Sequence, residues 1–93
     1  MPYIKQTNRA ALNEGINRVV DAVLALEDKQ PGTVAGNLNY VFSCIIDNVY
    51  RPVNYAKLNE AIGLLECCKA EYYARRARPY EDLKIKENGD MYA

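Results

Sequence analysis

Three long segments of the sequence carry apolar residues at alternating steps of three and four, and this spacing constrains the fold more than any other feature. Such steps return side chains to one face of an α-helix, so each segment predicts an amphipathic helix. Gln30-Pro31-Gly32 and Arg51-Pro52-Val53 separate the segments, and Pro79 is predicted to stop the third. The predicted helices span about residues 8–27, 34–50 and 55–77, with Thr7, Thr33 and Asn54 as N-caps.

The apolar stripe of each predicted helix should face a core. The stripes are Leu12, Ile16, Val19, Val23 and Leu26 in the first, Val34, Leu38, Val41, Ile45 and Val49 in the second, and Leu58, Ile62, Leu65 and Tyr72 in the third. Frequent β-branched residues leave a strand at 41–46 as an alternative, but the long, even period favours a helix.

The last segment has a pattern that is typical of strands. Leu83-Lys84-Ile85-Lys86 alternates apolar and charged residues, and Asn88-Gly89 is a strong hairpin-turn signal. We therefore predict a mainly α fold, a three-helix domain with a short C-terminal β-hairpin over residues 83–92. Because no repeat or linker interrupts the sequence, residues 1–93 are predicted to form a single domain.

The third predicted helix also carries a face of small side chains, roughly opposite its apolar stripe. This small-residue stripe consists of Ala56, Gly63, Cys67, Ala70, Ala74 and Ala77. Small residues let another helix approach closely, either the first helix of the same chain or the same helix of a second subunit. We favour the second subunit, because so short a chain has little stability to spare. The stripe is the predicted interface of a dimer or tetramer.

The composition argues against an enzyme and against a general DNA-binding protein. The chain has no His, the usual general base near neutral pH and the commonest zinc ligand. Twelve basic residues balance twelve acidic ones, whereas proteins that bind duplex DNA carry a basic excess. Cys44, Cys67 and Cys68 are interpreted as buried free thiols. We expect no catalytic residue, no metal, no cofactor and no sequence-specific duplex DNA partner.

The sequence also carries signals for cellular location. Residues 1–5 lack the hydrophobic run of a signal peptide, and no segment approaches the length that crossing a bilayer requires. We expect a cytoplasmic protein without a membrane partner.

Cationic and aromatic side chains interleave around the end of the third predicted helix. This Tyr/Arg cluster consists of Tyr73, Arg75, Arg76, Arg78, Tyr80, Lys84 and Lys86. Aromatic rings stack on nucleic-acid bases for about 1–3 kcal/mol per base, and Arg binds phosphate through two parallel hydrogen bonds. In this hypothesis the two tyrosines stack on bases, Arg76 and Arg78 hold phosphates, and the lysines add positive field at the rim.

A purely structural interpretation of the cluster is also open, and it is favoured by spacing alone. The helix dipole stabilises basic residues at a helix C-terminus by about 0.3–1 kcal/mol each. Glu71 and Arg75 are spaced for an ion pair within one helix.

Several motifs resemble a known family. They are Pro2-Tyr3-Ile4-Lys5-Gln6, the run from Asn59-Glu60-Ala61-Ile62-Gly63 to Glu66-Cys67, and Pro79-Tyr80-Glu81-Asp82 continuing through 84–90. Through them nearly the whole chain resembles a family of short, mostly phage-encoded proteins of unassigned function. In size and character it is also similar to phage sponges, homo-oligomers that sequester cyclic dinucleotides without cleaving them and so disarm the CBASS defence of the host.

The cluster and the resemblance together give the functional prediction. The resemblance implies a non-catalytic phage anti-defence protein that sequesters a small anionic nucleotide, a cyclic dinucleotide above all, in the host cytoplasm. The alternative is a phage protein–protein interaction module or minor structural module without a nucleotide ligand. Binding of single-stranded nucleic acid is a third interpretation, but it needs an extended positive groove that a neutral monomer scarcely offers.

Overall fold

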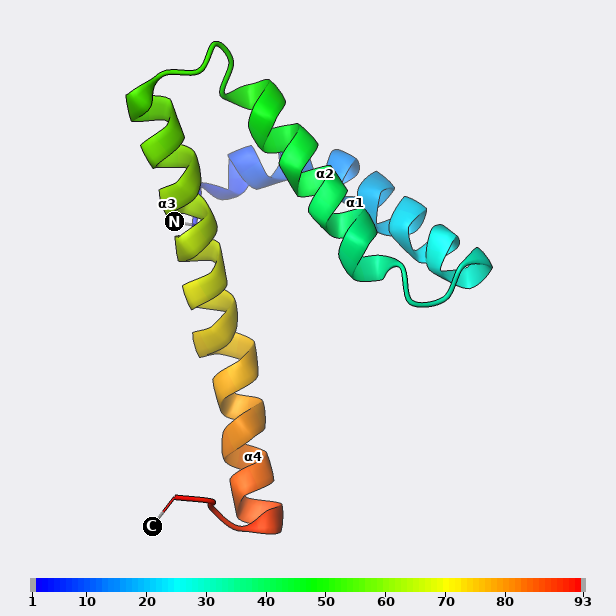
Figure 1. The fold of residues 1–93 in the computed structure, drawn as a ribbon, viewed down its shortest axis with the longest axis vertical. Helices are drawn as coiled ribbons and strands as arrows, with labels where there is room; N and C mark the ends of the chain where they lie inside the picture. Colours follow the sequence, from blue (N-terminus) through cyan, green and yellow to red (C-terminus); the bar gives the residue numbers. More distant parts are fainter. Residues whose placement is uncertain (1, 93) are drawn as a thin grey trace.

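The computed structural model describes residues 2–92, and every regular element in them is helical. The elements are α1 (Gln6–Lys29), α2 (Val34–Val49), α3 (Tyr55–Tyr72), the π-helical turn η1 (Tyr73–Ala77) and α4 (Arg78–Asn88). Helices α1 and α2 form a hairpin, and α3, η1 and α4 follow one another as a long rod (Figure 1). The three predicted helices are therefore confirmed, with α1 two residues longer at each end than predicted.

The side chain of Glu27 holds the turn between α1 and α2. Its two carboxylate oxygens accept hydrogen bonds from the backbone N–H groups of Gly32 at 2.7 Å and Thr33 at 3.0 Å. Gly32 has a φ of +89°, which residues with a side chain rarely adopt. Thr33 precedes α2 but makes no side-chain capping bond to it, so the capping role predicted for its side chain is wrong. Thr7, the other predicted cap, lies inside α1.

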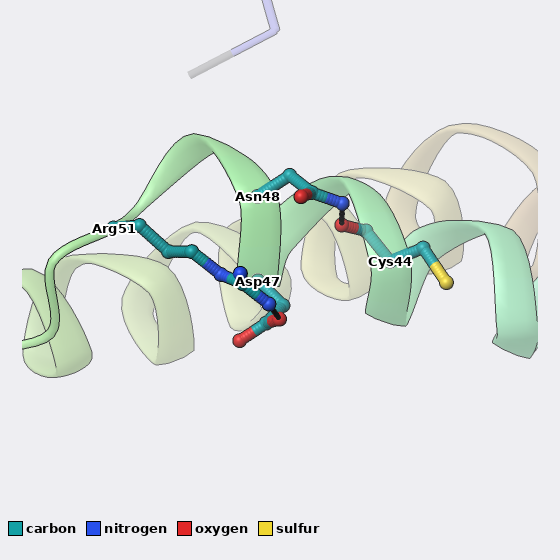
Figure 2. A network of polar contacts seen from close by, with 4 residues as sticks. All are labelled: Cys44, Asp47, Asn48 and Arg51. Carbon is teal, nitrogen blue, oxygen red and sulfur yellow. Dashed lines mark hydrogen bonds and ion pairs between the residues drawn. The ribbon is translucent and has the colours of Figure 1, made fainter.

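The connection from α2 to α3 is held by contacts between near neighbours. At the end of α2, Arg51 pairs with Asp47, and Asn48 Nδ2 donates to the carbonyl oxygen of Cys44 at 2.7 Å (Figure 2). Helix α3 then begins after Asn54, whose side-chain oxygen accepts from the N–H of Lys57 at 2.9 Å. Asn54 is thus confirmed as the N-cap of α3.

Pro79 lies within the rod, and the prediction that it ends the helix is wrong. Proline has no N–H, and its ring clashes in an α-helix with the carbonyl four residues earlier, here that of Arg75. Through η1 the hydrogen bonds widen to a step of five, with the N–H of Arg78 donating to the carbonyl of Tyr73. The wider turn accommodates the proline ring, so the helix continues to Asn88.

The predicted C-terminal β-hairpin over 83–92 is wrong, because residues 2–92 contain no strand and α4 occupies most of that segment. An alternation of four residues is too short to separate a period of 2 from one of 3.6. Ion pairs along α4 join Arg78 to Asp82 at 3.4 Å and Lys84 to Glu87 at 3.1 Å. Gly89, with a φ of +87°, donates its N–H to the carbonyl of Ile85 at 2.8 Å and ends the helix instead of turning a hairpin.

The chain is open, and most of its apolar surface is uncovered. Among the described residues only Val23 and Ala61 are buried. The radius of gyration is 17.1 Å, whereas a compact chain of this length has about 12 Å. Helix α1 packs on α2, but α3 packs comparably on neither (Figure 1). The apolar stripes of the three helices therefore do not meet in one core within a single chain.

Candidate functional site

The rod distributes the Tyr/Arg cluster over two separate hollows. The N-terminal hollow, of about 520 Å³, is lined by Pro2, Tyr3, Cys68, Glu71, Tyr72, Arg75 and Arg76. The C-terminal hollow, of about 410 Å³, is lined by Arg78, Tyr80, Glu81, Lys84, Ile85 and residues 88–92. The seven predicted side chains are therefore not gathered into one site.

The N-terminal hollow joins two parts of the chain that are far apart in sequence. The hydroxyl of Tyr3, in the segment before α1, donates a hydrogen bond to Glu71 Oε1 of α3. This hydrogen bond raises the pKa of Tyr3, and the nearby positive charge of Arg75 partly offsets the rise. The ring of Tyr72 lies on the same hollow and is 69% exposed. The hollow therefore brings together two aromatic side chains and two arginines.

The N-terminal hollow has more positive than negative side chains. Within residues 2–92, neither Arg75 nor Arg76 has a carboxylate oxygen within 4.0 Å. Arg76 Nη1 donates instead to the backbone carbonyl of Arg75 at 3.2 Å. The ion pair between Glu71 and Arg75 that their spacing allows is not formed, and Glu71 accepts from Tyr3. Two guanidinium groups thus share this hollow with a single carboxylate.

The C-terminal hollow is electrically balanced. Its cations, Arg78 and Lys84, are both paired along α4, and the carboxylates of Glu81 and Asp90 line the same hollow. Lys84 Nζ also lies 5.4 Å from the centre of the Tyr80 ring. Because these pairs are about half exposed, each contributes little stability. An anion has less to gain here than in the N-terminal hollow.

The two remaining members of the predicted cluster lie outside both hollows. The carboxylate of Glu81, near the Tyr73 hydroxyl, raises the pKa of Tyr73, and Arg78 partly offsets the rise. Lys86 is exposed on α4. Neither side chain shares a hollow with the unpaired arginines.

Sequence reasoning missed Tyr3, Glu71 and Tyr72 as members of the site. Tyr72 has the spacing of a core residue, so its exposed ring was assigned to the apolar stripe. Tyr3 and Glu71 are 68 positions apart, and no local period connects them. The only signal that pointed to Tyr3 was the resemblance at the start of the chain, which brought no chemistry with it.

The small-residue stripe is open in the single chain. Ala56, Gly63, Cys67, Ala70 and Ala74 are exposed and Ala77 is half-buried. A methyl group placed on Gly63 would meet no atom within 4 Å. Helix α1 of the same chain therefore does not occupy this face, and its use as a subunit interface remains a prediction.

The three cysteines are free thiols, as expected, but their predicted burial is wrong. Cys67 and Cys68 are exposed on α3, and Cys44 is half-buried. Among residues 2–92, no three Cys, Asp or Glu side chains converge as metal ligands would. No helix in the described part of the chain has the length and apolar character needed to span a bilayer.

Comparison with known protein families gives a match that spans nearly the whole chain. No curated protein and no solved structure matches the chain. The model of the family described as "Domain of unknown function (DUF6899)" matches residues 1–91. Because this match spans nearly the whole sequence, the chain belongs to the DUF6899 family.

Proposed function

We propose that the protein is a non-catalytic binding protein that assembles with itself and sequesters a small anionic nucleotide, with a cyclic dinucleotide as the first candidate. One observation carries this proposal. Arg75 and Arg76, without a carboxylate partner in the described chain, share a hollow with the rings of Tyr3 and Tyr72.

The chemistry of the N-terminal hollow matches the two parts of a nucleotide. A guanidinium group donates two parallel hydrogen bonds to a phosphate, and a tyrosine ring offers a flat surface to a base. A hollow of about 520 Å³ lies within the range of small-molecule sites in proteins. Arg75 and Arg76 are the primary phosphate ligands in this proposal, because Arg78 and Lys84 are already paired. Tyr80 and Lys86 act at the periphery.

The symmetry of a cyclic dinucleotide fits a protein that is itself an oligomer. The ligand has two phosphates and two bases related by a two-fold axis, and a single hollow offers one pair of arginines. A second copy placed by a two-fold axis would supply a second pair. In this proposal the protein acts as a phage anti-defence sponge in the host cytoplasm and removes the signal by binding alone.

Isothermal titration of the full chain against a panel of cyclic dinucleotides tests the proposal. We expect binding to at least one member, a loss of at least tenfold in affinity for Arg76→Ala, and weaker binding as ionic strength rises. Arg18→Ala is the matched control, because it removes the same charge from an exposed residue of α1 that pairs with Glu14 at 2.7 Å. No heat with any member at tens of micromolar would overturn the proposal.

A second function, a protein–protein interaction module or minor structural module, is favoured by a different observation. Large apolar side chains are exposed along every helix, including Val49 at 69% and Ile62 at 63%. Surfaces of this kind mark protein interfaces. Association through them should persist at high salt, whereas capture of a phosphate should weaken, so the salt dependence of binding separates the two functions.

A further inference from the structure

An apolar groove of about 620 Å³ runs between α1 and α2. Its principal side chains are Leu12, Ile16 and Val20 of α1 and Leu38, Phe42 and Ile45 of α2. No charged or hydrogen-bonding side chain lines it, and Ile16 and Phe42 remain 55% and 52% exposed. The described chain therefore leaves much of this apolar lining in contact with water, at a free-energy cost that a covering surface would remove.

Helix α3 carries an apolar ridge that the described residues leave about half exposed. Leu58, Ile62 and Leu65 lie on one face of the helix and are 49%, 63% and 44% exposed. The rod leaves the end of α2 and runs away from the hairpin (Figure 1), and the groove lining includes no residue of α3 from the same described chain. A groove between two helices and a ridge on a third are the complementary parts of a helical core.

The exposed area shows how much surface a second copy would have to cover. The chain exposes 8283 Å², whereas a compact protein of 10.5 kDa exposes about 5,400 Å². An interface of standard size removes only about 800 Å² from each partner. A single contact of that size would leave most of the excess uncovered, whereas two reciprocal contacts per pair of chains would cover far more of it.

We propose that the α1–α2 groove of each chain receives the Leu58, Ile62 and Leu65 ridge of α3 from a second copy, in a reciprocal exchange about a two-fold axis. Each groove then gains the third helix that its own chain does not supply, and both three-helix cores are completed. The small-residue stripe lies on the opposite face of α3 and stays available for a further contact. This inference goes beyond the proposed function, because it does not involve a nucleotide.

Sedimentation velocity of the full chain tests whether the two surfaces are needed for assembly. We expect a dimer or larger assembly for the natural sequence, and dissociation constants raised on the order of 100-fold by Ile16→Lys in the groove and by Ile62→Lys on the ridge. Leu24→Lys is the matched control, because Leu24 is also in α1 and is 56% exposed but does not line the groove. A lone 10.5 kDa particle for the natural sequence would overturn the inference.

Disulfide trapping tests which surfaces meet, and it does not depend on a disruptive variant. In a background with Cys44, Cys67 and Cys68 replaced by Ser, one chain carries Leu38→Cys or Phe42→Cys and the other carries Leu58→Cys or Ile62→Cys. We expect a mixed disulfide on oxidation for at least one of the four pairings. A groove variant that crosslinks to itself as readily, or four pairings without a mixed disulfide, would overturn the exchange. Neither result would change the outcome of the nucleotide titration, so the exchange and the proposed function can fail separately.

Discussion

Glu27 links α1 to the start of α2 through its own charge, which makes the α1–α2 turn sensitive to pH. The N–H groups of Gly32 and Thr33 stabilise the carboxylate, so the pKa of Glu27 is lower in the folded chain than its ordinary value of 4.5. A carboxyl with a depressed folded pKa contributes stability that is fully present above the unfolded pKa. That contribution is lost as the pH falls through the folded pKa.

We therefore expect the turn to loosen in mild acid before the helices unfold. A carbon-detected NMR titration of the Glu27 carboxyl should give a pKa below 4.5, and amide exchange at Gly32 should accelerate as Glu27 protonates. Glu27→Gln should remove this acid dependence. Glu14→Gln is the control, because Glu14 also lies in α1 and is exposed, but it pairs with Arg18 and not with the turn. A Glu27 pKa at or above the ordinary value would contradict the assignment.

Asn54 makes the other side-chain contact that defines a helix start. Its oxygen satisfies the N–H of Lys57, and no other side chain caps α3. We expect Asn54→Ala to lower the free energy of unfolding by about 1 kcal/mol, within the 0.5–2 kcal/mol range of such caps. Urea unfolding at a fixed protein concentration measures it. Asn54→Ser should retain most of the stability, and an equal loss for both variants would argue against a capping role.

At the scale of elements, the π turn explains how a proline is accommodated inside a long helix. Pro79→Ala restores an N–H and removes the ring that clashes with the carbonyl of Arg75. We expect a higher free energy of unfolding by about 1–3 kcal/mol, with no loss of helicity. Thermal unfolding followed by circular dichroism measures both. Pro31→Ala, in the turn between α1 and α2, is the control and should not stabilise, and a loss of helix in Pro79→Ala would contradict this account.

Local sequence patterns predicted some of these elements correctly and others wrongly. The helices and the Asn54 cap follow from spacing and side-chain type, which act between residues close in sequence. The C-terminal helix was missed because four alternating residues fit two periods, and because Asn88-Gly89 can end a helix as well as turn a hairpin. The Tyr/Arg cluster failed as one site for a geometric reason. Side chains two positions apart on a helix point in nearly opposite directions, so Arg76 and Arg78 line different hollows.

At the scale of the whole molecule, the sequence pattern does not show which apolar helix faces pack against each other. Amphipathic spacing identifies the stripe on each helix, but it does not say whether the covering helix comes from the same chain. In this structure α3 leaves the hairpin, and apolar residues predicted for a core, such as Ile16, Ile45 and Ile62, stay half exposed. The contact between Tyr3 and Glu71 was missed for the same reason, since it joins distant segments.

The small-residue stripe of α3 gives a prediction for the assembly as a whole. Gly63 has open space around it, so in an isolated chain a larger side chain there would meet nothing and would strengthen the helix by up to about 1 kcal/mol. If the stripe packs closely on a second α3, the same side chain would force the two backbones apart. An isolated chain should therefore be stabilised by a larger side chain at position 63, whereas an assembly packed through the stripe should be destabilised by it.

We expect Gly63→Leu to weaken self-association at least tenfold in sedimentation velocity, which corresponds to about 1.4 kcal/mol. Gly36→Leu is the matched control, because Gly36 is also a helical glycine with open space but lies in α2, outside both the stripe and the α1–α2 groove. It should leave association unchanged. Equal association for Gly63→Leu and the natural sequence, together with higher stability, would show that the stripe faces solvent in the assembly and that the subunits meet through other surfaces.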